Sequence, residues 1–232
     1  MKKIYSFIFL FAMGISLNAQ KILFIGDSIT DGKWGYECDG TRNTDDMNHI
    51  FGHGYMYLIA AKYMAVYPDS AMQFYNRGIS GNTVKDLAER WDSDVLSVNP
   101  DVLSVLIGIN DVLNDNPSVD TVAFEKMYRE ILTKSRTQNP NLVILLGEPF
   151  CESGFRIDSE GVIRKKCEAL SRAVQRIAKD YDASFIPCQA FFDKLSKESG
   201  DTSYWIWDGV HPTPAGHYEM SVLWEQHLPT KK

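Results

Sequence analysis

A serine at the end of a short apolar run is the first residue that could do chemistry. The run at 21–26 ends in glycine, and Asp27, Ser28 and Ile29 follow it, where a buried chain must turn away sharply. Gly26 permits a tight backbone, and amide N–H groups at the start of a following helix could stabilise a negatively charged oxygen. Ser28 is therefore a candidate nucleophile. Standing alone, such a turn more often holds a serine that only caps a helix.

An aspartate and a histidine near the C-terminus could activate this serine. Asp208 precedes His211 by three residues, so both side chains can share one backbone turn. One imidazole nitrogen would donate to the carboxylate while the other faces the serine hydroxyl. The imidazole would take the serine proton during attack on a carbonyl and return it to the leaving alcohol. The spacing predicts a catalytic triad of Ser28, His211 and Asp208.

Two further loops could supply donors to a developing oxyanion. Gly81 would bring a bare backbone N–H close to a substrate, and the side-chain amide of Asn110 could donate beside it. Each loop has a structural alternative as well. Asn82 or Thr83 could simply begin a helix, and Asn110 could form an Asx turn.

Elements that could position these residues alternate along the chain. Helix-length amphipathic segments separate short apolar runs that are suited to buried strands. The expected strands lie at 21–26, 72–76, 101–108, 141–147 and 183–187, and the expected helices at 54–67, 83–98, 119–137, 162–181 and 215–227. This order favours one doubly wound α/β sheet with its active site at the carboxyl ends of the strands.

With these motifs in this order, the chain resembles the SGNH, or GDSL, hydrolase family. The matching blocks are 26–29, Gly81, 108–111 and 208–211, and only Ile29 departs from the family pattern, which has leucine there. The resemblance implies a three-layer α/β/α sandwich with a central, mainly parallel five-stranded sheet, similar to flavodoxin. It also implies ester hydrolysis through an acyl-enzyme on Ser28, without metal or organic cofactor. The Ser28 and Gly81 N–H groups and the Asn110 amide would form the oxyanion hole.

Aromatic residues near the candidate site suit a carbohydrate ester. They are Trp34, Tyr36, Tyr204, Trp205 and Trp207. Flat rings stack on sugars, and exported members of the resembled family often deacetylate polysaccharides. We expect Asp27, Trp34 and Trp207 to contact a small-molecule or polysaccharide ester, although such rings can equally close a core. The alternatives are a lysophospholipase- or thioesterase-type acyl hydrolase, or a non-catalytic carbohydrate-binding protein.

Composition limits the remaining function classes. The 232 residues can bury one substantial core, and 24 basic against 30 acidic residues give a net charge of -6. No run of lysine or arginine forms the basic stripe that nucleic acid requires. The oligomeric state is left undetermined.

Residues 1–19 read as a signal peptide that precedes a domain at 20–232. Lys2 and Lys3 precede an apolar stretch of roughly a dozen residues, and Ala19 offers a small residue for cleavage. A retained anchor is the alternative, but the stretch is shorter than the roughly 20 residues that span a bilayer. We expect an exported protein, periplasmic or extracellular, with no stable membrane span in its mature form.

The cysteines and the other histidines leave alternatives open. Export would allow disulfides among Cys38, Cys151, Cys167 and Cys188, in any of three pairings if all four pair, or leave buried thiols. His49 and His53 are spaced like two metal ligands on a helix, but nearby glycines argue against a helix there. A loop that contacts substrate is the stronger interpretation. His217 reads as a solvent-facing or capped histidine.

Overall fold

A parallel sheet brings the chain turns named above to one edge. The computed structural model describes residues 20–36, 41–43, 47, 49–113 and 120–229. Its strands are β1 (Lys21–Gly26), β2 (Gln73–Gly78), β3 (Val102–Leu106), β4 (Val143–Gly147) and β5 (Ser184–Ile186). All pair in parallel in the order β2-β1-β3-β4-β5. This is the flavodoxin-like order, with the switch point between β1 and β3, and it confirms the expected fold class.

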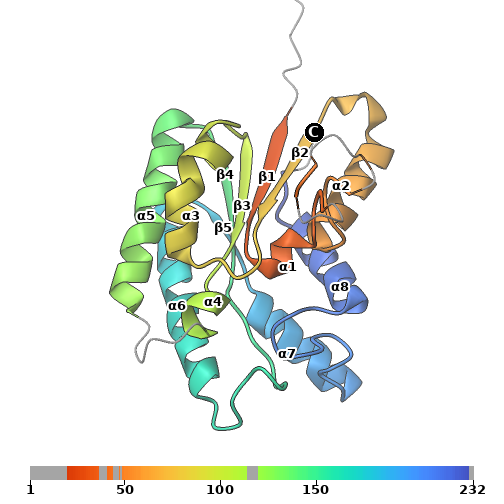
Figure 1. Cartoon of the computed structure of the whole chain (residues 1–232), viewed down its shortest axis with the longest axis vertical. Coiled ribbons are helices and arrows are strands. Elements are labelled where there is room, and N and C mark those ends of the chain that lie inside the picture. The colour runs from red at the N-terminus through yellow and green to blue at the C-terminus, as the bar shows by residue number, and fades with distance from the viewer. Residues whose placement is uncertain (1–19, 37–40, 44–46, 48, 114–119, 230–232) are drawn as a thin grey trace, which may run out of the picture.

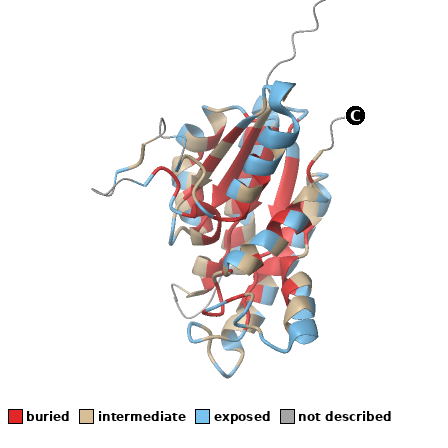
Figure 2. Cartoon of the chain, turned by 90° about the vertical axis from the view of Figure 1, so that its right-hand side faces the viewer, coloured by how far each residue is buried: buried red, intermediate tan, exposed pale blue. Residues whose placement is uncertain are grey.

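Helices cover both faces of the sheet (Figure 1). They are α1 (Ser28–Asp31), α2 (Tyr55–Val66), α3 (Val84–Trp91), α4 (Ile109–Leu113), α5 (Thr121–Gln138), α6 (Val162–Asp180), α7 (Cys188–Ser199) and α8 (Pro214–Glu225), with a 3-10 turn at Pro68–Ser70. In Figure 1, α3, α5 and α6 lie on one side of the sheet, and α2 and α8 lie on the other. The central strands β1, β3 and β4 are therefore largely buried on both faces, as Figure 2 shows in red.

Two of the longer helices, α3 and α7, differ from the sequence expectation. The helix expected at 83–98 ends at Trp91 and continues as a π-helical segment at Asp92–Leu96, where aspartate and serine are poor helix formers. Helix α7 was not expected at all, although Phe192 is fully buried on it and Gly200 ends it in a left-handed conformation. Its apolar residues all lie between Cys188 and Leu195, and this stretch is too short to show the periodic pattern of a longer amphipathic helix.

Strand register fixes which loops meet. Gly26 at the end of β1 lies opposite Gly78 of β2 and Leu106 of β3. Residues that follow these three positions must therefore emerge side by side at the carboxyl edge of the sheet. Buried apolar side chains hold the strands there, since Leu23, Phe24 and Ile25 have no exposed surface. The sheet is thus a rigid platform for the loops that carry Ser28, Gly81 and Asn110.

Candidate active site

Ser28 sits where β1 turns into the short helix α1. The Asp27 side chain accepts a hydrogen bond from the Ile29 N–H at 3.0 Å and caps that helix. Gly26 is required at this turn because a Cβ atom there would lie 2.2 Å from the Leu106 carbonyl oxygen. The turn therefore lifts Ser28 above the sheet edge, and its side chain lines an open cavity.

The turn at 208–211 is held closed by the carboxylate of Asp208. Its Oδ1 accepts hydrogen bonds from the Val210 N–H at 2.9 Å and the His211 N–H at 2.7 Å. Gly209 adopts φ +94°, and a Cβ atom there would collide with the Glu152 carbonyl oxygen. Asp208 and His211 thus share one turn, as their three-residue spacing suggested. Asp208 Oδ1 accepts from the backbone of this turn, and Oδ2 is left for the His211 ring.

The three residues of the expected triad form one hydrogen-bonded chain. Ser28 Oγ lies 2.8 Å from His211 Nε2, and His211 Nδ1 lies 2.7 Å from Asp208 Oδ2. A carboxylate can only accept, so Nδ1 carries the proton and Nε2 is left as the acceptor for the serine hydroxyl. These are the geometry and the tautomer that serine activation by a neutral imidazole requires.

Asp208 is fully buried and remains ionised because its oxygens are surrounded by donors. Burial by itself would raise the pKa of Asp208, but hydrogen bonds from the His211 backbone, the His211 ring and the Val210 backbone outweigh it, and the pKa lies below its usual value. Arg156 adds a further contact, since its Nε donates to Asp208 Oδ2 at 2.6 Å. No motif in the sequence singles out Arg156, which lies in the loop between β4 and α6.

The two expected oxyanion donors both line the same cavity as Ser28. Gly81 has φ +83°, and a Cβ atom there would meet open space, so the backbone conformation and not crowding requires glycine. The Asn110 amide donates one hydrogen bond to the Asn82 carbonyl at 3.0 Å and keeps a second N–H for another acceptor. The alternative reading also holds in part, because Thr83 caps α3 in a capping box with Asp86.

A buried ion pair fixes the loop that carries Gly81. Asp31 accepts from the Ser80 N–H at 3.0 Å and from the Ser80 hydroxyl at 2.6 Å. Both Asp31 oxygens also accept from Arg42, at 2.9 and 3.1 Å. Although burial opposes ionisation, the hydrogen bonds from Arg42 and Ser80 lower the pKa of Asp31. Sequence reasoning missed this anchor because Asp31, Arg42 and Ser80 belong to no common local pattern.

His217 forms part of the cavity wall, which its spacing in the sequence did not indicate. Its Nδ1 accepts the otherwise free Tyr55 N–H at 3.2 Å and so caps α2, whose N-cap residue Gly54 has no side chain to do so. In the neutral ring the proton then sits on Nε2. Burial lowers the pKa of His217 to about 4, and nearby His53 and His211 act in the same direction.

Two of the three expected substrate contacts do not reach the cavity. The Asp27 side chain is buried at 1% exposure beneath the turn, and burial raises its pKa to about 7. Trp34 is 8% exposed, and its indole N–H donates to the Gly78 carbonyl at 2.8 Å while Arg42 stacks on the ring. Both expectations are corrected, because the Asp27 side chain caps α1 and the Trp34 side chain packs against Gly78 and Arg42. Trp207 does line the cavity and is 52% exposed.

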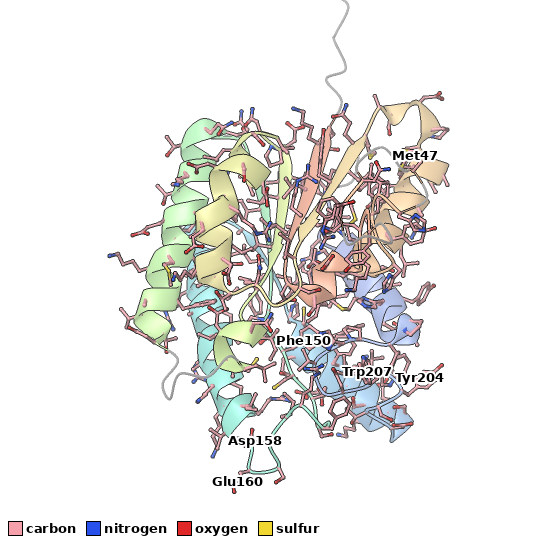
Figure 3. The ribbon with its side chains drawn as sticks, viewed as in Figure 1. Met47, Phe150, Asp158, Glu160, Tyr204 and Trp207 are labelled. Carbon is pink, nitrogen blue, oxygen red and sulfur yellow. The ribbon has the colours of Figure 1, made fainter. Side chains whose placement is uncertain are left out.

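The cavity has a volume of about 530 Å³, and its wall exposes both polar and apolar surface. Its described lining is Ser28, Gly32, Lys33, His53, Ser80, Gly81, Asn110, Arg156, Trp207, His211, Pro212 and His217. Tyr204 and Trp207 lie on the loop between α7 and α8, and Figure 3 shows both at the same end of the molecule. Phe155 packs edge-on against Trp207, so two exposed rings flank the opening.

The described cysteines are unpaired and buried. Cys151, Cys167 and Cys188 are free thiols, and Cys38 lies outside the described residues. Cys151 and Cys167 are within hydrogen-bond reach of one another, and that contact lowers the pKa of Cys151. In the part of the chain that the structure describes, none of the helices combines the length and the apolar character needed to cross a membrane.

Comparison with known proteins gives a consistent set of relatives. The model of the GDSL-like lipase/acylhydrolase family matches residues 24–218. An acetylxylan esterase from Geobacillus stearothermophilus is 35% identical over 206 residues, which cover 86% of this chain and 90% of that protein. The residues that the family model matches include every residue discussed above for the site.

Solved structures agree with the sequence comparison. A protein from Parabacteroides merdae assigned as a GDSL-like lipase superimposes with a TM-score of 0.79 and 31% identity, covering 91% of this chain and 97% of that one. A catalytic mutant of the Geobacillus stearothermophilus acetylxylan esterase, with a histidine replaced by alanine, gives a TM-score of 0.79 and 29% identity, covering 91% and 95%. Variants of that esterase with an aspartate or a serine replaced by alanine are likewise described as catalytic mutants.

Proposed function

Because the chain belongs to the GDSL-like lipase/acylhydrolase family and is a carboxylic ester hydrolase, we propose that it removes acetyl groups from carbohydrates through an acyl-enzyme on Ser28. The observation that carries the proposal is the hydrogen-bonded chain from Ser28 Oγ through His211 to Asp208, set in an open cavity. The relative's name, acetylxylan esterase, supports the acetyl group and the carbohydrate.

The proposed reaction follows from the tautomer of His211. Ser28 Oγ attacks the ester carbonyl while Nε2 accepts its proton, and Asp208 stabilises the imidazolium that forms. The Ser28 N–H, the Gly81 N–H and the Asn110 amide donate to the oxyanion. His211 then gives the proton to the leaving alcohol, which leaves an acetyl group on Ser28. Water, deprotonated by His211, attacks this acyl-enzyme and releases acetate.

The character of the cavity wall favours a short acyl group on a polar alcohol. The described lining includes serine, lysine, arginine, asparagine and histidine side chains beside Trp207 and Pro212. A long acyl chain that covered these polar and charged groups would remove them from water without offering them hydrogen bonds. A sugar, in contrast, can hydrogen-bond to these groups and stack on the exposed Trp207 ring. This argues against the lysophospholipase and thioesterase alternatives.

Model esters of different chain length test the proposal. We would compare hydrolysis of 4-nitrophenyl acetate, butyrate and octanoate, and acetate release from acetylated xylan, by the wild type and Ser28→Ala. Ser159→Ala, on an exposed loop, is the matched control. We expect preference for acetate, release from xylan, and a loss of roughly 10⁴-fold or more in Ser28→Ala only. Preference for octanoate would point to lipid or thioester substrates, and full activity in Ser28→Ala would refute the mechanism.

We also propose that the protein is exported and that residues 1–19 are removed as a signal peptide. The basic and then apolar composition of this segment supports the proposal. Mass spectrometry of the protein recovered from a periplasmic or extracellular fraction should find a chain that starts at Gln20, as glutamine or pyroglutamate. Recovery only from the cytoplasm, starting at Met1, would contradict it.

A further inference from the structure

Lys33 brings an ammonium group to the wall of the active-site cavity. It follows α1 directly, and both Gly32 and Lys33 adopt left-handed backbone conformations, with φ of 51° and 61°. Its Nζ lies 4.7 Å from the centroid of the Tyr36 ring, and no described carboxylate pairs with it. By comparison, Lys62 on α2 and Lys134 on α5 both form ion pairs with carboxylates. The charge of Lys33 is therefore available to a ligand.

Arg156 presents a second cation to the same cavity. Its Nε is engaged by Asp208, but no described residue accepts a hydrogen bond from either terminal nitrogen. The side chain is 49% exposed. The contact with Asp208 fixes the plane of the guanidinium, and the two terminal nitrogens keep the fork geometry that binds a carboxylate through two hydrogen bonds. Arg156 is thus held in place on one edge and open on the other.

Of the two cations, only Arg156 has a described acidic partner, the buried Asp208, and no carboxylate of the described lining faces Lys33. None of the lining residues is aspartate or glutamate, in a chain whose net charge is -6. Asp208 lies beneath the cavity, fully buried and surrounded by four donors. In the β4–α6 loop, Glu148 and Glu152 are buried, and Asp158 and Glu160 lie at the loop tip, well separated from Trp207 in Figure 3. The described lining therefore carries positive charge on an acidic protein, and such a region attracts anions.

We propose that the cavity binds an acetylated glycan that contains a uronic acid, with the sugar carboxylate held by Lys33 and Arg156. This inference rests on the proposed function and adds the charge of the substrate to it. A neutral acetylated sugar could hydrogen-bond to the polar groups of the lining, Lys33 and Arg156 included, and stack on Trp207, but it has no charge to attract the two cations. A carboxylate close to the ester would gain charge-assisted hydrogen bonds from Arg156 and attraction from Lys33.

Carboxyl reduction of the substrate isolates the effect of its charge. Acetylated oligogalacturonides carry a carboxylate on the esterified sugar, and acetylated glucuronoxylan oligosaccharides carry it on a branch. Each would be compared with its carboxyl-reduced, neutral form as substrate for the wild type, Lys33→Met and Lys179→Met. Lys179 is an exposed lysine on α6, outside the cavity lining. For each variant the measurement is kcat/KM on the native form divided by kcat/KM on the reduced form, so a general change in activity cancels.

We expect the wild type and Lys179→Met to prefer at least one native form on the order of fivefold, and Lys33→Met to lose at least half of that preference. The preference should also fall at 0.5 M salt, because exposed charges are then screened. The glycan that shows it identifies the source of the carboxylate. Equal efficiency on native and reduced forms in the wild type, or an unchanged preference in Lys33→Met, overturns the anion subsite and leaves the deacetylase standing. No acetate from any of these glycans overturns both.

Discussion

The buried carboxyl group of Asp27 gives a quantitative prediction about stability. It lies next to Ser28 with 1% of its surface exposed, and its Oδ2 has no hydrogen-bond partner in the described structure. Burial raises its pKa from 3.8 to about 7; the Ile29 N–H opposes the shift and the charge of Asp111 adds to it. Asp27 is therefore an acid that the folded protein keeps neutral at pH values where the unfolded chain ionises it.

The sign of the effect follows from proton binding. Between pH 3.8 and 7 the folded state holds a proton on Asp27 that the unfolded state has lost. The free energy of unfolding must therefore decrease as the pH rises through this window. The stabilisation that protonated Asp27 contributes is fully present only below pH 3.8. A shift of about three pKa units corresponds to roughly 4 kcal/mol in total.

Asp27→Asn removes this titration while keeping a side-chain oxygen for the Ile29 N–H. The asparagine amide has no acceptor in place of Oδ2, which costs the variant a constant amount at every pH. We expect the unfolding free energy of Asp27→Asn minus that of the wild type to increase by about 4 kcal/mol from pH 4 to pH 8. Urea denaturation followed by tryptophan fluorescence at each pH measures it, and the subtraction cancels all other groups.

His217 acts in the opposite direction, which makes the subtraction necessary. Its pKa falls from 6.5 to about 4, so its contribution is present above pH 6.5 and is lost as the pH falls towards 4. In the wild type the two effects partly cancel between pH 4 and 6.5. As the pH falls from 6.5 to about 4, the unfolding free energy of His217→Gln should therefore decrease by about 3 kcal/mol less than that of the wild type. A difference between Asp27→Asn and the wild type that stays constant from pH 4 to 8 would refute the reasoning.

Three further predictions concern the oxyanion loop and the thiols. Asn110→Ala should lower kcat for 4-nitrophenyl acetate by roughly 10²- to 10³-fold, while the exposed control Asn141→Ala stays at wild-type rate; similar rates in both would remove Asn110 from the oxyanion hole. Asp31→Asn should weaken the hold on Ser80 and lower kcat roughly tenfold or more with a smaller change in KM, and an unchanged kcat would show that Gly81 is positioned without this anchor. Refolding with oxidised glutathione should join Cys151 to Cys167 in peptide maps made without reduction, and a disulfide to Cys188 instead would contradict the observed contact.

The sequence alone determined the features that depend on short-range geometry. An apolar run that ends in Gly26 must turn, so Ser28 could be placed at a strand end before any contact was known. The three-residue spacing of Asp208 and His211 likewise fits one turn, and the structure clamps that turn with Asp208 itself. Alternation of strands and helices then predicted the parallel sheet, because right-handed crossovers leave few other arrangements.

Only the tertiary structure decided what surrounds those residues. Arg156 reaches Asp208 across 52 positions of the sequence, and Ser80 reaches Asp31 across 49. Asp27 and Trp34 looked like substrate contacts, yet they are buried by packing that involves β2 and β3. Backbone spacing determines contacts within a turn, but contacts between distant segments depend on how the sheet and loops pack, and no local pattern records that packing.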